Sequence, residues 1–455
     1  MLSRSKRIIS FSVLVALGLL LFVLAFFPDF SYNTIKSLLR INLNTEKWFP
    51  VIGKLLLGIS FIFFAFAFAI LFFPQLQNLY KEHNILFYAI SFFIIALICR
   101  FAGFGFESGD YKGFLEPWFN TFKANRIEAI RTDVGDYTVI YKYFILIFTF
   151  IPINPLYSYK LLSITFDFLL AIYSGLFIHK ITGSKIKALL GYAVVLFLPN
   201  FILNSSVWGQ CDSIFSFFIL LSCYYLYLKK ERKCIIYFTI AFCFKIQAVF
   251  FLPVLIVYLM EKKLNIKSLI WFPVVYLIVI LPSILCGMSP FYALFGAYLK
   301  QTTEYPSINF NAANLYMIFS NGFLNQNINF LLIGLTLGLC AVIAFIFTND
   351  KDDKPQKLIL LSYLFTLIVP FTLPHMHERY FYLSEVFAIL FAFTFSNYYY
   401  ISIITIFSSL PELIQFLFGI NSNVNLVFMG YLMFIGILLL FRVVHKEIRL
   451  EINKV

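Results

Sequence analysis

The side chains of this sequence that could do chemistry gather in four polar stretches, each set beside an apolar segment. The stretches are ESGDYKGF with TDVGDYTV, NSSVWGQCDS, NFNAANLY and PHMHERYFY. A further segment, FKIQ, places a Lys and a Gln inside an apolar run. The candidate residues are Asp110, Asp136, Trp208, Gln210, Asp212, Lys245, Gln247, Asn311, Asn314, His375, His377, Glu378 and Arg379.

This combination of groups suits the transfer of a sugar from a lipid phosphate to a hydroxyl. A carboxylate can take a proton from the attacking hydroxyl. Arg and Lys can hold the phosphate, Arg with two parallel hydrogen bonds. Ionisable groups at membrane depth are costly, so each of them is a functional candidate.

Each candidate also has a structural alternative. Asp110 could cap the helix that follows it, and Lys245 could place its ammonium at the interface or neutralise a buried Asp. Glu107 and Glu116 could be ordinary loop charges. The two histidines of PHMHER lie two residues apart, which does not match the helical spacing of HExxH zinc sites. We therefore expect no metal at that motif.

The composition indicates an all-α polytopic membrane protein. Of the 455 residues, 61% are hydrophobic and 13% are charged, against about 45–50% and about 25% in soluble domains. The apolar runs are continuous rather than alternating, which excludes a membrane β-barrel. The net charge of +13 comes mostly from Lys and Arg clusters between these runs. Such clusters are typical of membrane orientation rather than of nucleic-acid binding.

The lengths of the apolar runs predict about 12–14 transmembrane helices. The predicted helices cover residues 8–28, 51–73, 85–102, 156–179, 186–203, 213–228, 267–285, 327–348, 357–373, 381–396, 399–418 and 425–442. Residues 137–153 are expected to lie in the interface. Residues 234–260 are expected to form two short helices joined near 244–247, which puts Lys245 near the outer side.

The positions of Lys and Arg place both termini in the cytoplasm. With alternate crossings, the polar segments 103–136, 204–212, 286–326 and 374–380 then share the extracytoplasmic side, which predicts a single site there. We divide the chain into N-terminal membrane helices (1–84), a catalytic module with the polar loops (85–382), and C-terminal helices with a basic tail (383–455). In a bacterial cell the membrane would be the plasma membrane.

Taken in order, the motifs resemble the GT-C glycosyltransferases that use polyprenyl- or dolichyl-phosphate sugars. The two GDY sequences, at 109–111 and 135–137, are similar to the first outer loop of the enzymes of N-glycan assembly, among them α-1,3-glucosyltransferases. FKIQAVFFLP, NAANLYMIF and HMHERYFY are similar to the later family segments KQM…YYAP, KVANFW and HVHEK. The WGQ-D and HERY forms look like bacterial relatives of the GPI-anchor mannosyltransferases. The resemblance covers about residues 103–382, with Thr138-Val139 in place of Pro-Pro and Asn311 in place of the Lys of KVAN.

The resemblance implies a GT-C fold, with a large first extracytoplasmic loop carrying short interfacial helices, and an inverting hexosyltransferase. Asp110 would be the general base, and Lys245, Arg379 and His377 would hold the donor phosphate. Sugar-binding, acceptor-binding or supporting roles would fall to Asp136, Asp212, Gln210, Trp208, Gln247, Asn311, Asn314, His375 and Glu378.

The implied partners are a polyprenyl-phosphate-linked sugar, with mannose first and glucose next, a glycan or glycolipid acceptor, and membrane lipid. No nucleic acid and no particular cofactor are implied, and a bound divalent cation is left open. Two other functions stay open from the residues themselves. One is a transporter or flippase, because charges and broken helices also mark substrate pathways. The other is an oligosaccharide polymerase or ligase of the same broad fold.

Overall fold

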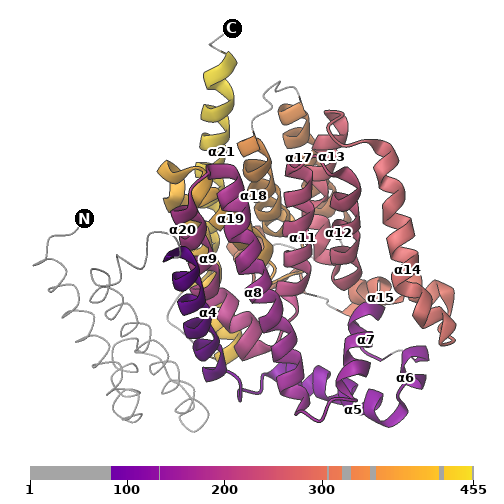
Figure 1. The fold of residues 1–455 in the computed structure, drawn as a ribbon. Helices are drawn as coiled ribbons and strands as arrows, with labels where there is room; N and C mark the ends of the chain where they lie inside the picture. The colour runs from indigo at the N-terminus through magenta and orange to yellow at the C-terminus, as the bar shows by residue number, and fades with distance from the viewer. Residues whose placement is uncertain are drawn as a thin grey trace, which may run out of the picture.

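The computed structural model describes residues 84–452, except 133, 305–306, 320–328, 349–354 and 420–424. The predicted helices 8–28 and 51–73, and the N-terminal division 1–84 apart from its last residue, therefore lie outside the described residues. The described part is a bundle of helices (Figure 1). Its one sheet among these residues is a parallel pair of two-residue strands, β1 (Asn309–Phe310) and β2 (Met376–His377).

Six helical segments in this part are long and apolar enough to cross a bilayer. They are α4 (Asn84–Ala102), α8 (Pro155–Thr182), η4 with α14 (Ile266–Leu285), α17 (Asn329–Thr348), η7 with α20 (Ser396–Phe418) and α21 (Leu426–Ile452, its apolar part ending at Lys446). A bent pair of helices gives up to seven. These helices confirm a multi-pass α-helical membrane protein.

Several predicted spans are shorter in the structure than a bilayer crossing requires. α11 (Asp212–Tyr227) and α19 (Tyr382–Thr394) are apolar helices of 16 and 13 residues, where about 20 are usual. The apolar part of α18 (Pro355–Thr372), from Gln356 to Thr372, is just below the length of the six segments above. Most residues of α11 and α19 are buried against other helices. Ten of the predicted helices fall in the described residues, where six, or up to seven, helical segments are long and apolar enough to cross a bilayer. Apolar runs that form the interior of a bundle look like spans in sequence.

α8 is the central helix of the bundle and packs against α9 (Lys185–Phe197), α11 and α19 (Figure 1). Local sequence fixes both of its ends. The Asn154 side chain accepts a hydrogen bond from the Leu156 backbone N–H at 2.9 Å, and Pro155 occupies the first turn, where no N–H is required. Gly183 ends the helix with a φ of 67°, a left-handed conformation that glycine adopts without steric cost.

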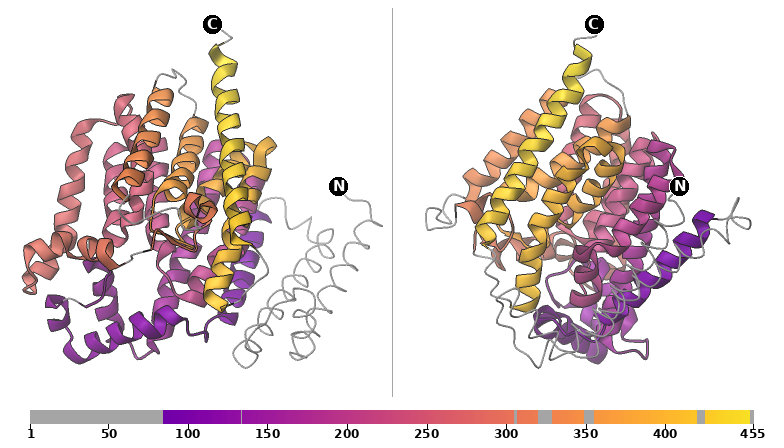
Figure 2. Two further views of the ribbon diagram at one scale, coloured as in Figure 1. Left: turned by 180° about the vertical axis from the view of Figure 1, so that it is seen from behind. Right: turned by 90° about the vertical axis from the view of Figure 1, so that its left-hand side faces the viewer.

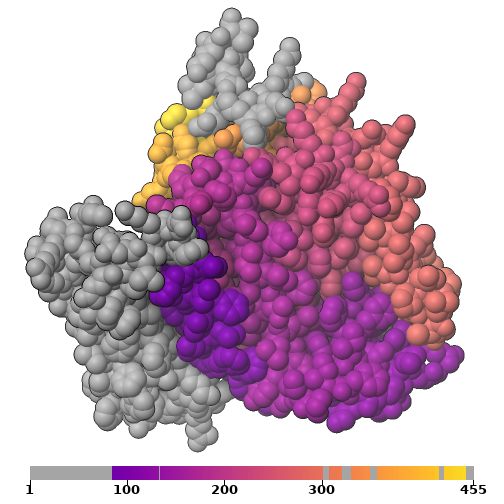
Figure 3. Space-filling model, viewed as in Figure 1, coloured from indigo at the N-terminus to yellow at the C-terminus, as the bar shows by residue number. Residues whose placement is uncertain are grey.

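The first polar loop folds into short helices at one end of the bundle. They are η1 (Tyr111–Leu115), α5 (Glu116–Asn125), α6 (Glu128–Arg131) and α7 (Val139–Phe148). This confirms short helices within the loop, and the ten residues of α7 are too few to cross a bilayer. In the space-filling view the loop forms the lower surface beside the residues of α14 and α15 (Ala297–Glu304) (Figure 3).

Two breaks in the helices carry polar side chains into the bundle. The predicted helix 186–203 is bent rather than continuous: α9 ends at Phe197, and α10 (Pro199–Ile202) with η2 (Leu203–Trp208) continues at an angle of 47°. Pro199 explains the break, because it has no N–H to continue the helical ladder. The predicted join near 244–247 is confirmed: α12 (Glu231–Phe244) ends before Lys245, and η3 (Ile246–Phe251) and α13 (Leu252–Met260) follow.

The C-terminal helices close the opposite side of the bundle from α14. α20 and α21 pack together, and α21 extends beyond the neighbouring helices toward its C-terminal end (Figure 2). This helix ends ten residues later than predicted, because the basic segment after Phe441 continues it. The β1–β2 pair, which the sequence did not predict, joins the third polar stretch to the fourth, with Phe310 opposite His377.

Candidate functional site

The turn that carries Asp110 is held in place by a buried lysine. Lys160 on α8 donates hydrogen bonds to the carbonyl oxygens of Gly103, Phe104 and Phe106 at 2.9, 3.0 and 2.6 Å. These carbonyls lie in the turn after the end of α4 at Ala102, and that of Gly103 also accepts from the Phe106 N–H at 3.1 Å. One side chain therefore satisfies three carbonyls and fixes the path of the chain toward Asp110.

Asp110 does not cap the helix that follows it. Its side chain makes no capping hydrogen bond to η1, and the Ser108 hydroxyl accepts from the Tyr111 N–H at 3.1 Å instead. The carboxylate oxygen Oδ2 of Asp110 accepts hydrogen bonds from Trp208 Nε1 at 3.0 Å and Gln210 Nε2 at 2.8 Å. The side chain is 21% exposed, and Oδ1 has no hydrogen bond to any residue that the structure describes.

The two donors to Asp110 come from the turn at the end of η2. Gly209 has a φ of 81°, which lets the chain reverse so that both neighbours of this glycine reach Asp110. The Gln210 amide has one favourable orientation, with its NH₂ group facing Asp110, because the Asp110 carboxylate can only accept. Oε1 then faces Tyr137, whose hydroxyl donates to it at 3.0 Å. The WGQ sequence is thus built as a donor pair for a carboxylate.

Asp212 and Lys245 form a buried ion pair behind Asp110. Lys245 Nζ lies 2.5 Å from Asp212 Oδ1, and the two side chains are 5% and 1% exposed. Asn204 donates to the other oxygen, Oδ2, at 3.0 Å. The extended backbone of Lys245 between α12 and η3 directs its side chain toward this pair. Of the two structural alternatives for Lys245, neutralisation of a buried Asp is the one found.

Arg379 lies among three carboxylates. Its Nη1 is 3.3 Å from Glu378 Oε1 and 3.9 Å from Asp110 Oδ2, and its Nε is 3.8 Å from Asp212 Oδ2. The guanidinium carbon also lies 4.8 Å from the centre of the Trp208 ring, a cation–π distance. Strand pairing holds this segment, because the Glu378 N–H donates to the Phe310 carbonyl at 3.1 Å.

The electrostatic environment differs for the two neighbours of Arg379 in the HER sequence. Burial, with the nearby charges of Arg379 and Lys245, lowers the pKa of His377 to about 2, so the imidazole is neutral at any working pH. Burial raises the pKa of Glu378 to about 7, although Arg379 opposes this shift. Burial also raises the pKa of Asp136, against the fields of Arg379, Lys300 and Lys245. His377 can therefore donate or accept a hydrogen bond, and it brings no positive charge.

The structure does not bring every sequence candidate into this cluster. His375 Nδ1 lies 2.6 Å from the Ser307 carbonyl, and Asn314 caps α16 (Leu315–Ile318) by accepting from two N–H groups. Asn311 is exposed and has a φ of 58°. Gln247 is buried on η3, and its Oε1 has no hydrogen bond within the described residues. Glu107 pairs with Lys112 at the surface, as expected of a loop charge.

Sequence reasoning missed a set of buried polar residues around the site. Besides Lys160, these are the ion pair of Arg100 on α4 with Asp167 on α8, which excludes solvent completely, and Glu385 on α19, which accepts a hydrogen bond from Asn200 at 2.6 Å. The usable signal was a charged residue inside an apolar run, as in PLYSYKLLSITFDFLL.

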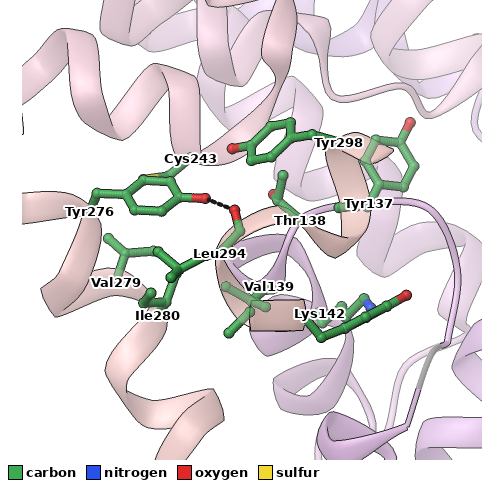
Figure 4. Close-up of a pocket in the computed structure, with 13 residues that line it drawn as sticks. Tyr137, Thr138, Val139, Lys142, Cys243, Tyr276, Val279, Ile280, Leu294 and Tyr298 are labelled. Atoms are coloured by element: carbon green, nitrogen blue, oxygen red, sulfur yellow. Dashed lines mark hydrogen bonds between the residues drawn. The ribbon is translucent and has the colours of Figure 1, made fainter. Parts of the chain in front are cut away.

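A second hollow adjoins the cluster through the residues after the second GDY. It is lined by Tyr137, Thr138, Val139, Lys142, Cys243, Tyr276, Val279, Ile280, Tyr292, Ala293, Leu294, Ala297 and Tyr298 (Figure 4). Tyr276 donates its hydroxyl to the Leu294 carbonyl at 2.6 Å, and Thr138 donates to the Phe244 carbonyl at 3.3 Å. Tyr137 is shared with the Asp110 cluster, so this aromatic hollow and the cluster are neighbours.

Within the described residues, no group of three or more His, Cys, Asp or Glu side chains could hold a metal ion. Comparison of the chain with protein-family models gives no match, and comparison with curated protein sequences gives none either. The arrangement itself combines the Asp110 carboxylate, which has hydrogen bonds at one oxygen only, the Arg379 guanidinium, which lies among carboxylates, and the neutral imidazole of His377. Such a set can accept a proton at one atom and bind an anion a few ångströms away.

Proposed function

We propose that this protein is an inverting glycosyltransferase of the GT-C class, which moves a hexose from a polyprenyl-phosphate donor to a hydroxyl of a glycan or glycolipid acceptor. The observation that carries the proposal is that only one of the two carboxylate oxygens of Asp110 accepts hydrogen bonds from the described residues. Both of its described donors, Trp208 and Gln210, reach Oδ2. Oδ1 is left for the proton of an acceptor hydroxyl, and the Arg379 guanidinium lies 3.9 Å from the other oxygen, Oδ2.

The reaction needs one displacement at the anomeric carbon. Asp110 Oδ1 takes the hydroxyl proton while the acceptor oxygen forms a bond to that carbon. The bond from the carbon to the phosphate oxygen breaks on the opposite face, and its electron pair leaves with the polyprenyl phosphate. The products are the glycoside with inverted configuration, the lipid phosphate, and a protonated Asp110 that returns its proton to water. The base and the leaving group must therefore face each other across the sugar.

Arg379 is our candidate for holding the leaving phosphate. It can offer parallel N–H groups to two phosphate oxygens, and its side chain is 10% exposed, which leaves a path to a ligand. Lys245 acts indirectly in this scheme, because its ammonium is already paired with Asp212. Because Lys245 neutralises Asp212, the attraction between Asp212 and Arg379 is weaker. His377, being neutral, would serve as a hydrogen-bond donor.

Membrane placement is part of the proposal. Both termini would lie in the cytoplasm, and the Asp110 cluster would face the other side, where lipid-linked sugars present their head groups. The apolar surface of the bundle supports its insertion in a bilayer, since residues such as Leu285 and Phe330 are 77% and 91% exposed. A lipid donor could then reach the cluster from the bilayer without leaving it.

The test is a donor screen with membranes that contain the protein. Polyprenyl-phosphate mannose and polyprenyl-phosphate glucose, each radiolabelled in the sugar, are supplied separately, and products are sized by chromatography. We expect one sugar added to a membrane acceptor, and a fall of roughly 10²–10⁴-fold for Asp110→Asn, the range for removal of a general base.

The matched control is Glu107→Gln, which removes a carboxylate three residues away that pairs with Lys112 at the surface. This variant should keep full activity. Substantial transfer by folded Asp110→Asn would exclude Asp110 as the base. No sugar transfer from either donor would favour transport, and movement of a whole chain would favour a polymerase or ligase.

A further inference from the structure

A small polar cavity lies behind the Asp110 cluster, at the break between α9 and α10. It is lined by Asn200, Asn204, Glu378, Arg379, Tyr382, Glu385, Ser409 and Leu413. These residues come from α10, η2, the segment after β2, α19 and α20. The cavity has a volume of about 10 Å³, which is about the space that one water-sized particle occupies.

Three oxygens of the side chains around this cavity are acceptors without donors, and one donor, Arg379 Nε, also has no hydrogen-bond partner among the described residues. Asn200 Oδ1, Asn204 Oδ1 and Glu385 Oε2 are buried and have no hydrogen-bond partner among the described residues. All three side chains are at least nine-tenths buried. Such groups cost free energy unless something satisfies them.

The orientation of both amides follows from their partners. Asn200 donates its NH₂ group to Glu385 Oε1 at 2.6 Å, and Asn204 donates its own to Asp212 Oδ2 at 3.0 Å. An amide that gives its NH₂ group to a carboxylate must turn its oxygen the other way. The unpartnered oxygens are therefore fixed by the hydrogen-bond network, and a flip of either amide would set an oxygen against a carboxylate.

The charge of the lining calls for one positive charge. Burial raises the pKa of both Glu378 and Glu385 to about 7. Above that pH the two carboxylates carry two negative charges and Arg379 carries one positive charge, so the lining then has a net charge of −1. Ser409 and Asn200 both donate to Oε1 of Glu385, at 2.5 and 2.6 Å, which leaves Oε2 as the oxygen that lacks compensation. A carboxylate oxygen, two amide oxygens and a compact polar space are a ligand set for a hard cation.

We infer that this cavity binds a single small alkali cation, of which Na⁺ is the best fit. A divalent ion would leave an excess positive charge, and Mg²⁺ keeps several waters in an octahedral shell that a cavity of about 10 Å³ does not admit. Broken helices whose unwound ends face a cavity are used to coordinate Na⁺ in other membrane proteins. Here the break is that of α9 and α10 at Leu198 and Pro199.

The cation site is coupled to the candidate active site through shared residues. Arg379 and Glu378 line the cavity and also belong to the Asp110 cluster, and Asn204 links the cavity to the pair of Asp212 with Lys245. A cation beside Glu378 competes with Arg379 for that carboxylate. Occupancy of the cavity therefore changes the charge that Arg379 can offer to an anion.

The inference is tested by binding of ²²Na⁺ to the purified full-length protein in nanodiscs, without donor or acceptor. We expect about one equivalent of ²²Na⁺ that unlabelled NaCl displaces. The midpoint of thermal unfolding should rise by about 5 °C between choline chloride and NaCl at equal ionic strength, the shift expected when Na⁺ greatly exceeds its dissociation constant. Neither readout requires sugar transfer, so failure of the proposed function would leave this test intact.

Glu385→Gln is the decisive variant. Its amide oxygen can still accept from Asn200 and Ser409, while its NH₂ group takes the place of the cation, so we expect a folded protein without ²²Na⁺ binding and without the salt-specific shift. Glu412→Gln is the matched control, because Glu412 is a buried carboxylate on α20 that accepts from the Ala313 N–H instead. It should bind ²²Na⁺ normally. A wild-type protein that binds no ²²Na⁺ and unfolds alike in both salts would overturn the inference, and the cavity would then hold a water molecule or a proton on Glu385.

Discussion

Two arginine–carboxylate pairs in this protein differ in how completely the carboxylate is satisfied. Arg100 donates to Asp167 Oδ2 at 3.1 and 2.9 Å, and Tyr382 donates to Oδ1 at 2.9 Å, with both charged side chains 0% exposed. Asp110 receives hydrogen bonds at one oxygen only, and Arg379 lies 3.9 Å away. The first pair is closed, and the second is open on one side.

The difference separates a stabilising pair from a reactive one. A buried ion pair with its hydrogen bonds complete has nothing left to offer a ligand, and removal of one partner is costly. A carboxylate with one oxygen occupied and the other accessible is held in position and can still accept a proton. We therefore expect substitutions at the closed pair to change stability, and substitutions at the open pair to change activity.

The largest effect is expected at the closed pair. Arg100→Leu leaves Asp167 as an unpaired charge in the bundle, which costs about 3–5 kcal/mol of unfolding free energy. Thermal unfolding in detergent, followed by size-exclusion chromatography, measures the loss. The double variant Arg100→Leu, Asp167→Leu should recover most of it, and equal instability of the single and double variants would contradict the comparison.

The next effect is expected at the open pair. Asp110→Asn should keep the unfolding midpoint within about 2 °C of the wild type, because the side chain is partly exposed and an amide oxygen can replace Oδ2 as acceptor. In the same preparation, transfer should fall as proposed above. A strongly destabilised Asp110→Asn protein would place Asp110 with Asp167 among the structural carboxylates.

A smaller effect is expected for Arg379→Lys. The ammonium keeps the charge and loses the paired N–H groups and the stacking on Trp208. We expect the KM for the donor to rise by about 10-fold, which corresponds to about 1.4 kcal/mol, with a smaller change in kcat. Steady-state kinetics with varied donor concentration separates the two. An unchanged KM would mean that Arg379 does not hold the donor phosphate.

The pH dependence of the open pair should come from Glu378. Burial raises the pKa of this carboxyl to about 7, so it is neutral below pH 7 and ionised above. Ionised Glu378 competes for Arg379, and the KM for the donor should therefore rise between pH 6 and pH 8. In Glu378→Gln, the KM for the donor should stay at its low-pH value from pH 6 to pH 8. If the KM of this variant still rises over that range, the pH dependence comes from another group.

The same pKa has a consequence for stability. Since the folded state binds the proton of Glu378 more tightly than the unfolded chain, this group favours folding at acidic pH. That contribution is lost as the pH rises through about 7. The unfolding midpoint of Glu378→Gln should accordingly fall less than that of the wild type between pH 6 and pH 8.

The smallest effect is expected for His377. Its pKa of about 2 keeps it neutral, so His377→Gln, which retains a hydrogen-bonding group, should change transfer by less than about 5-fold, the worth of one neutral hydrogen bond. The pH profile should not move. A profile that shifts in this variant would show that His377 titrates in the working range.

The sequence predicted the helical membrane class, most helix positions and the break at Lys245, because each depends on local hydrophobicity or on a polar residue in an apolar run. It also selected Asp110, Gln210, Asp212 and Arg379, which the structure brings together. Proximity of these residues follows from packing that no local pattern encodes, and the one-sidedness of the polar loops was the only available signal for it.

Other features of the site depend on tertiary partners. Lys160 stood among apolar residues, and its three carbonyl partners lie more than fifty positions away. The roles of His375 and Asn311 follow from left-handed backbone conformations at φ values of 62° and 58°, which their residue types allow but do not require. The bend after α9 had a visible cause in Pro199, and the run of apolar residues across it concealed the break.

The Lys160 anchor has a consequence for how the protein could move during turnover. Because three carbonyls within residues 103–106 are tied to α8, the segment before Asp110 cannot swing as a lid, and its position is set when the chain folds rather than when a substrate arrives. Closure around a bound sugar would then have to come from the facing side, where Arg379 follows a two-residue strand. Amide hydrogen exchange should therefore be slow at Gly103, Phe104 and Phe106, whose N–H groups are hydrogen-bonded, with or without ligand. Any protection gained on binding should appear at residues 375–381.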